Sequence, residues 1–233
     1  MENLYDSSYK STTGTSVLSI VMRKVYTRMF FALIVTALTA LYVASSPAIL
    51  ATIFGSKVIF FGLIIAELAV VFVVSGMLDK LSSTTAVLLF YLYAILNGVV
   101  FSSIFVIYEL GSIAYTFFIT AGVFGAMSVY GLVTKNDMTK FGSYCIMALF
   151  GLIIASVVNI FVASSTLDWI ISLVGVALFI GLTAWDTQKI KNAAYMTEPS
   201  QTGKLATIGA LSLYLDFINL FLYLLRFFGR SND

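Results

Sequence analysis

The chain contains no histidine, one cysteine (Cys145) and two prolines in 233 residues. The absence of histidine excludes the Ser-His pair of a serine protease, a His-ligated haem and the usual His-containing zinc sites. A lone cysteine excludes an intramolecular disulfide. We therefore predict a protein that is not an enzyme and that holds no organic cofactor and no catalytic metal; no nucleic-acid partner is expected.

Charge is also scarce. Only 10% of the residues are charged, whereas a soluble domain has about 25%, and 60% are hydrophobic with a mean hydropathy of +1.01. Such a chain is typical of an all-α integral membrane protein that crosses the lipid bilayer several times, because a helix satisfies its own backbone hydrogen bonds in lipid.

Seven apolar stretches have about the 20 residues that a membrane-spanning helix needs. They predict a tail over residues 1–28 and one seven-helix membrane domain over residues 29–230. The sixth helix is expected to continue through Asp186 toward Lys191, and a re-entrant last segment is the alternative to a seventh crossing. The predicted spans are Met29–Ser45, Val58–Leu78, Ala86–Tyr108, Ser112–Val133, Ser143–Ala163, Trp169–Trp185 and Leu205–Phe228.

Lysine and arginine predict the orientation, because short loops rich in these residues stay in the cytoplasm. Ten of the thirteen basic residues fall in the tail and in the loops on its side of the membrane, and only Lys57, Arg226 and Arg230 fall on the other. The N-terminal tail is therefore expected in the cytoplasm.

Three acidic residues, Glu67, Asp186 and Asp216, fall within a predicted span or at its inner end. A charge at the bilayer centre is costly, so each must be paired, protonated or hydrated. Antiparallel sixth and seventh helices would bring Asp186 and Asp216 together in the inner half of the membrane. Two such carboxylates do not ionise easily together, which predicts a shared proton and a pH-sensitive latch. Their oxygens also suit transient binding of calcium.

Structural explanations remain open for these polar residues. Asp186 is near Lys189 at the end of a span and fits a solvated helix end. Glu67 fits a hydrogen bond across a helix interface to Asn97, Asn159 or a serine. We interpret Asn97, Asn159 and a third asparagine, Asn219, as residues that bond between helices.

Several strings resemble the transmembrane Bax inhibitor motif family in its bacterial branch, over nearly the whole chain after the first 20 residues. They are ELAVVFVVSGMLDKLS, NGVVFSS, AMSVYGLVTKNDMTKFG, GLIIASVVNIF, GLTAWDTQKIK and GALSLYLDFINLFLYLLR.

The resemblance implies a seven-helix fold in which the C-terminal helix is central and wrapped by the other six. It also implies a pH-sensitive calcium leak that the pair matching Asp186 and Asp216 opens and closes. Lys80 is the nearest match to a basic residue that takes part in the latch in some members. The loop over residues 192–204 looks longer than in compact bacterial relatives.

The leading hypothesis is a leak that opens when the aspartate pair loses its proton, with Glu67 as an acidic station nearer the outer side. One alternative is a regulator that binds another membrane protein, such as a membrane protease or a death-pathway protein. The other is an intramembrane aspartyl protease, although Asp186 follows TAW rather than the glycine-containing motif of such enzymes.

Overall fold

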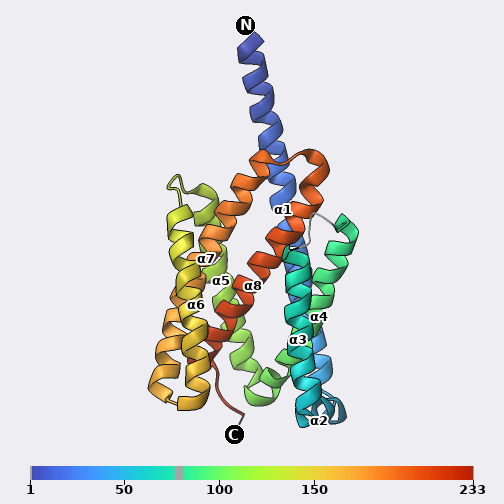
Figure 1. The fold of residues 1–233 in the computed structure, drawn as a ribbon, viewed down its shortest axis with the longest axis vertical. Helices are drawn as coiled ribbons and strands as arrows, with labels where there is room; N and C mark the ends of the chain where they lie inside the picture. Colours follow the sequence, from blue (N-terminus) through green and yellow to red (C-terminus); the bar gives the residue numbers. More distant parts are fainter. Residues whose placement is uncertain (1, 77–80, 233) are drawn as a thin grey trace. The chain divides into compact units, whose positions relative to one another are not determined.

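The computed structural model describes residues 2–76 and 81–232, with side chains from residue 16 onward except that of residue 75 (Figure 1). The described chain is helical almost throughout, as its composition predicts. The helices are α1 (Glu2–Ala44), α2 (Pro47–Gly55), α3 (Lys57–Gly76), α4 (Ser83–Ile107), α5 (Leu110–Val133), α6 (Thr139–Val162), α7 (Ser165–Met196), the 3-10 helix η2 (Pro199–Gln201) and α8 (Thr202–Phe228).

Within the described residues, seven spans are long and apolar enough to cross a membrane, which confirms the predicted all-α, seven-span fold class. The last helix, α8, is unbroken over 27 residues, or about 40 Å at 1.5 Å per residue. This length favours a full crossing over a re-entrant segment. The spans are Ser16–Ala44, Lys57–Val74, Ser83–Ile107, Leu110–Val133, Thr139–Val162, Ser165–Met196 and Pro199–Phe228.

Two segments differ from the sequence prediction. No helix boundary separates the tail over residues 1–28 from the first predicted span at Met29, because α1 runs unbroken from Glu2 to Ala44. The loop expected over residues 192–204 is mostly helical, since α7 reaches Met196 and η2 begins at Pro199. Both differences have one cause: hydropathy marks the part of a helix in lipid, whereas helix formation continues into water.

Contacts along the chain divide the protein into two compact units. Asp186 and Asp216 both belong to the second unit, so their surroundings can be described within it. The first unit comprises Met1–Ile107, Ile190–Leu211 and Asn232, and the second comprises Tyr108–Lys189, Ser212–Ser231 and Asp233.

In the first unit, polar groups join α1 to α4 and to the start of α8. The Thr36 hydroxyl donates to the Ala94 carbonyl at 2.9 Å. Arg28 donates to the Gly203 carbonyl and to the Thr207 hydroxyl, each at 2.6 Å. These bonds give the partly buried guanidinium of Arg28 its polar partners.

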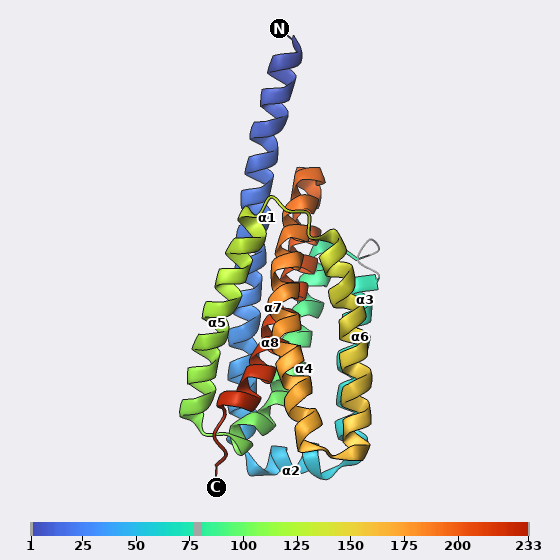
Figure 2. The ribbon, with the colours of Figure 1, turned by 90° about the vertical axis from the view of Figure 1, so that its left-hand side faces the viewer.

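In the second unit, α6 and α7 run antiparallel and are joined by a tight reversal (Figure 2). Ala163 takes a left-handed conformation with φ of 52°, which few residues other than glycine adopt. Asn159 closes the turn, because its backbone carbonyl accepts from the Ala163 amide at 2.8 Å and its side chain accepts from the Ser164 amide at 3.1 Å.

Aromatic and small residues pack α5 against α8 and α7 in the same unit. Phe217 of α8 meets Phe117 and Phe124 of α5 edge to face, with ring centroids 5.3 and 5.4 Å apart. Gly131 of α5 has no room for a Cβ because it lies against the backbone carbonyl of Ala184 on α7. The site helices α7 and α8 therefore have close partners along α5.

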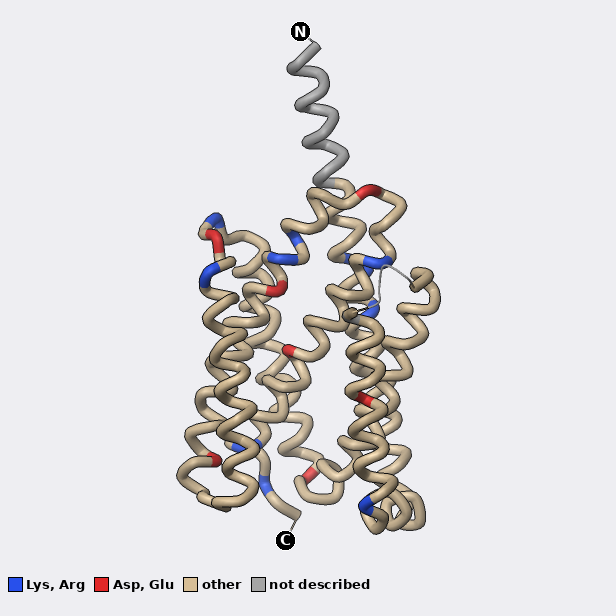
Figure 3. Tube along the Cα trace, viewed as in Figure 1, with Lys and Arg blue, Asp and Glu red and all other residues tan. Residues whose placement is uncertain are grey.

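Burial differs strongly among the spans. In an 18-residue apolar stretch of the last span, 67% of residues are buried, against 6% in the span of α3. Among the seven described spans, the last one has the largest buried share. Along the helices, basic residues gather near the ends, and a few acidic ones lie farther in (Figure 3). These inner acids need an explanation.

Candidate functional site

A cavity of about 680 Å³ lies in the second unit, lined by residues of α6, α7 and α8. The α6 side of the cavity is mainly aliphatic, and most of its polar groups come from α7 and α8. This combination of an apolar wall and a few polar groups is usual for a binding or transport site. The polar and charged lining residues are Ser156, Asp186, Lys189, Ser212, Asp216, Asn219, Tyr223 and Arg226.

Asp216 is the most enclosed acid of this cavity. It lies on α8 with 4% of its surface exposed. Its Oδ2 atom is buried and has no hydrogen-bond partner among the described residues. One turn further along, Asn219 uses its side chain on its own helix, donating to the Leu215 carbonyl at 2.8 Å. A carboxyl so placed is costly to ionise unless a cation, water or proton satisfies it.

Asp186 lines the same cavity from α7 and is half-buried. Lys189, one turn further along α7, places its ammonium group over the Trp185 ring, 5.0 Å from the centroid. The structure therefore brings together the two aspartates that the sequence singled out, and it continues α7 beyond Asp186, as expected.

The segment of α7 around Asp186 is held firmly by its neighbours. The Trp185 ring occupies the space beside Gly142 of α6, where a Cβ would overlap the indole. Gln188 is buried and reaches the α5–α6 loop: its Oε1 accepts from the Met138 amide at 2.9 Å and its Nε2 donates to the Asn136 carbonyl at 2.8 Å. Sequence reasoning missed Gly142 and Gln188, although both lie in strings that carry the family resemblance.

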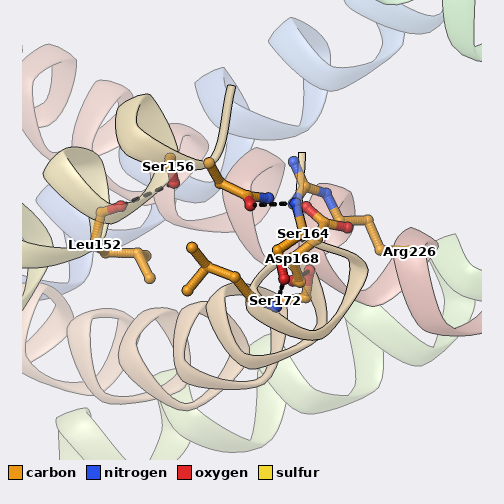
Figure 4. Close-up of polar contacts among 8 residues, drawn as sticks. Leu152, Ser156, Ser164, Asp168, Ser172 and Arg226 are labelled. Carbon is orange, nitrogen blue, oxygen red and sulfur yellow. Dashed lines mark hydrogen bonds and ion pairs between the residues drawn. The ribbon is translucent and has the colours of Figure 1, made fainter. Parts of the chain in front are cut away.

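An ion pair lies at the other end of α7 and α8 (Figure 4). Arg226 Nη1 donates to Asp168 Oδ1 at 2.8 Å and to the Ser172 hydroxyl at 3.3 Å. Sequence reasoning placed Arg226 only by topology and did not consider Asp168. The sequence did contain a signal for this ion pair. Asp168 begins one span and Arg226 ends the next, so two adjacent antiparallel helices would bring these opposite charges to the same end.

The other predicted residues do not join this site. Glu67 lies on α3 in the first unit, and its Oε1 atom is buried without a hydrogen-bond partner among the described residues. The interpretation that Glu67 bonds Asn97 therefore fails for this atom, and Asn97 instead donates to the Tyr93 carbonyl of its own helix at 3.2 Å. Lys80 lies outside the described residues.

We interpreted three asparagines as residues that form hydrogen bonds between helices. The hydrogen bonds that their side chains make in the described structure show that this interpretation is wrong. Asn97 and Asn219 each donate to a carbonyl four residues earlier in the same helix, and Asn159 closes the turn after α6. An amide in lipid needs a partner, and the nearest one is a carbonyl of its own helix or turn.

The charged groups of the cavity do not form a ready-made metal site. Among the described residues, no three His, Cys, Asp or Glu side chains gather as metal ligands do. Calcium takes six to eight oxygen ligands, so two carboxylates match a transient contact better than a resident ion.

Comparison with known proteins places the chain in a family. Residues 18–233 match the family model described as "Inhibitor of apoptosis-promoting Bax1". The chain is 49% identical over 212 residues to the inner membrane protein YbhL of Escherichia coli K12, covering 90% of this chain and 91% of YbhL. It is 48% identical over 215 residues to a protein of Borreliella burgdorferi, covering 91% and 93%. RP147 of Rickettsia prowazekii is 44% identical over 227 residues, covering 96% and 95%.

Fold and site thus define a multi-pass, all-helical membrane protein in which two aspartates line a cavity between α6, α7 and α8. The chain belongs to the Bax inhibitor family, which confirms the resemblance that its sequence strings indicate.

Proposed function

We propose that this protein is a pH-sensitive calcium leak that Asp186 and Asp216 open and close. The observation that carries the proposal is their shared cavity, in which the Asp216 carboxyl is buried and one of its oxygens has no partner among the described residues. The family resemblance points to the same two residues. Calcium ions and the surrounding lipid are the expected partners.

The mechanism follows from the chemistry of two neighbouring carboxyls. At low pH one proton is shared between them, and the hydrogen bond holds α7 and α8 together at this end of the cavity. At higher pH the proton leaves, and two negative charges in a medium of low dielectric constant repel each other. The helices separate, and the two carboxylates present oxygens to a passing calcium ion. Flow follows the existing gradient.

The groups that face the pair support this gating. Lys189 is the nearest basic residue of the cavity lining along α7, and the Trp185 ring attracts its ammonium group. Arg226 bonds Asp168 at the other end of the two helices. A proton or a cation is therefore the natural partner of the aspartates.

The direct test is calcium flux into liposomes that contain the purified protein and a calcium dye, at matched internal and external pH. Flux through the wild type should rise with pH, and either Asp186→Asn or Asp216→Asn should flatten that rise. Asp137→Asn, in an exposed loop, is the matched control and should keep the wild-type profile. A wild-type profile in both pair variants would make the aspartates structural.

We also propose the inner membrane of a bacterium as the location, as in the name of YbhL, with the N-terminus in the cytoplasm. The support is the loop charge, since ten of thirteen basic residues lie on one predicted side. Reporter fusions after Gly111 and after Lys140 should report opposite sides of the membrane. If they report the same side, the span count is wrong.

A second candidate function is regulation of another membrane protein, because the matching family model is described as an inhibitor of apoptosis-promoting Bax1. A membrane protease or a death-pathway protein would be the partner. A regulator that acts by binding alone tolerates loss of both aspartates, whereas a leak does not. Reconstituted protein without calcium flux at any pH would favour this candidate.

A further inference from the structure

We propose that the ion pair between Arg226 and Asp168 is a second closure of the cavity, at its outer end. This inference rests on the proposed leak and adds a barrier in series with the aspartate pair. Asp168 lies in the first turn of α7 and Arg226 in the last turn of α8. The pair therefore joins the two site helices at the ends opposite Asp186 and the start of α8.

The position of Arg226 between two hollows carries the argument. A smaller hollow of about 240 Å³ lies beside the main cavity in the same unit, and Asn159 and Asp168 line it. Ser156, Ile160 and Arg226 line both hollows. The guanidinium group, bonded to Asp168 at 2.8 Å, thus lies at their boundary.

Neighbouring side chains hold Arg226 in this place. Its guanidinium carbon lies 5.5 Å from the centroid of the Tyr223 ring. Tyr223 stacks on Phe179 of α7, with centroids 5.9 Å apart and planes inclined by 24°. Gly175 of α7 leaves the space that this ring occupies. The arginine is therefore oriented by aromatic contacts as well as by its ion pair.

The pair suits a barrier to cations. A guanidinium stays charged at physiological pH, so it repels a divalent cation at the boundary of the two hollows. Bonding to Asp168 fixes this charge across the boundary, and release of the bond allows the long side chain to move away. Because this pair joins opposite charges at 2.8 Å and needs no shared proton, the closure should not follow pH as the aspartate pair does.

The expected size of the effect is modest. The two side chains are 44% and 51% exposed, and half-exposed ion pairs contribute little. We therefore expect Arg226→Gln and Asp168→Asn each to raise calcium flux at pH 7.5 by about fivefold or less. The pH midpoint should stay at its wild-type value, which separates this effect from damage to the aspartate pair.

Matched controls come from the same end of the molecule. Arg230→Gln and Glu109→Gln remove the same charges from side chains with no ion pair among the described residues, and they should leave flux unchanged. The exchanged pair Asp168→Arg with Arg226→Asp should return flux toward the wild-type value. Flux that is unchanged in Arg226→Gln and Asp168→Asn, beside a normal pH response, would overturn the outer closure and leave the proposed leak standing.

A second readout needs no calcium. In a Cys145→Ser background, Asn219→Cys reports on the main cavity and Asn159→Cys on the smaller hollow, because each lines only one of them. A charged, membrane-impermeant thiosulfonate reagent is added outside spheroplasts. Arg226→Gln should speed the labelling of Asn219→Cys by about fivefold or less and leave that of Asn159→Cys unchanged.

The two readouts separate the two proposals. Faster labelling of Asn219→Cys in a protein without calcium flux would support the outer closure and overturn the leak. Equal labelling of Asn219→Cys with and without Arg226 would overturn the outer closure, whatever the flux.

Discussion

The two ends of the α7–α8 pair carry charge in opposite ways. At one end Asp186 and Asp216 place two like charges on one cavity, and an oxygen of Asp216 has no partner among the described residues. At the other end Arg226 and Asp168 place opposite charges in a 2.8 Å contact. In the proposed leak the first arrangement depends on a proton, whereas the second is an ion pair that needs none.

The difference between the two ends indicates which of them can respond to pH. Two neighbouring carboxyls attract each other while they share a proton and repel each other once both are ionised. Their interaction energy therefore changes sign as the proton leaves. An arginine–carboxylate pair keeps its attraction across physiological pH. Two helices joined in these two ways can separate at one end while the other end stays closed.

The largest expected effect is loss of the pH response when the aspartates are changed together. Asp186→Asn combined with Asp216→Asn should add little to the worse single variant, because residues that act as one unit are not additive. Asp216→Asn should be the worse single variant, since Asp216 is buried, whereas Asp186 is half-exposed beside Lys189. Liposome flux across pH measures both. Additive single effects would mean that the acids act separately.

A second expected effect is on stability at the firmly held end. Gly142→Ala should destabilise the protein by about 1–3 kcal/mol, because the new methyl group overlaps the Trp185 indole. Gly151→Ala, on the same helix, has open space and is the matched control. Thermal unfolding in detergent compares the two. Equal melting temperatures would show that Trp185 moves freely and that α7 is not anchored there.

A somewhat smaller loss is expected from Gln188→Ala, about 1–2 kcal/mol, since the variant leaves two backbone groups of the α5–α6 loop without their partner. Gln201→Ala, at an exposed position in η2, should cost little. The same melting experiment measures both. A wild-type melting temperature for Gln188→Ala would mean that water replaces the amide and that the loop is held by other contacts.

The smallest effect concerns an acid outside both pairs. The hydroxyl and the amide of Thr139 donate to Asp137, which lowers the pKa of that carboxyl below its ordinary value. A lowered pKa stabilises the fold above the ordinary value, and this contribution disappears as pH falls through the lowered one. Asp137→Asn should therefore lower the melting temperature slightly at pH 7 and equal the wild type in strong acid. A difference that persists there would assign the effect to another contact.

The sequence predicts the class of the protein, and it singles out the two aspartates that line one cavity, because unpaired backbone groups and charges are both costly in lipid. Lipid requires apolar helices, and an acid within them requires a reason, so composition and the positions of Asp186 and Asp216 were enough. Helix ends such as that of α7 at Met196 were missed because hydropathy does not detect a helix that continues into water.

The supporting contacts could not be predicted because they depend on register between helices. Gly142 needs Trp185 opposite it, and Arg226 needs Asp168, 58 residues earlier in the chain. The asparagines failed for a related reason. A polar side chain in a span needs a partner, but the sequence does not say whether that partner lies on another helix or on its own.

Hydrogen exchange of the Met138 amide, which donates to Gln188, can report on movement of α7. Met138 lies before α6, in the loop from α5, while Gln188 is two residues past Asp186 on α7. An amide held by a side-chain oxygen exchanges its hydrogen slowly, and it exchanges faster when the partner moves away. Isotope exchange at this one loop position therefore registers a shift of α7 without a label, an ion or a substitution in the cavity.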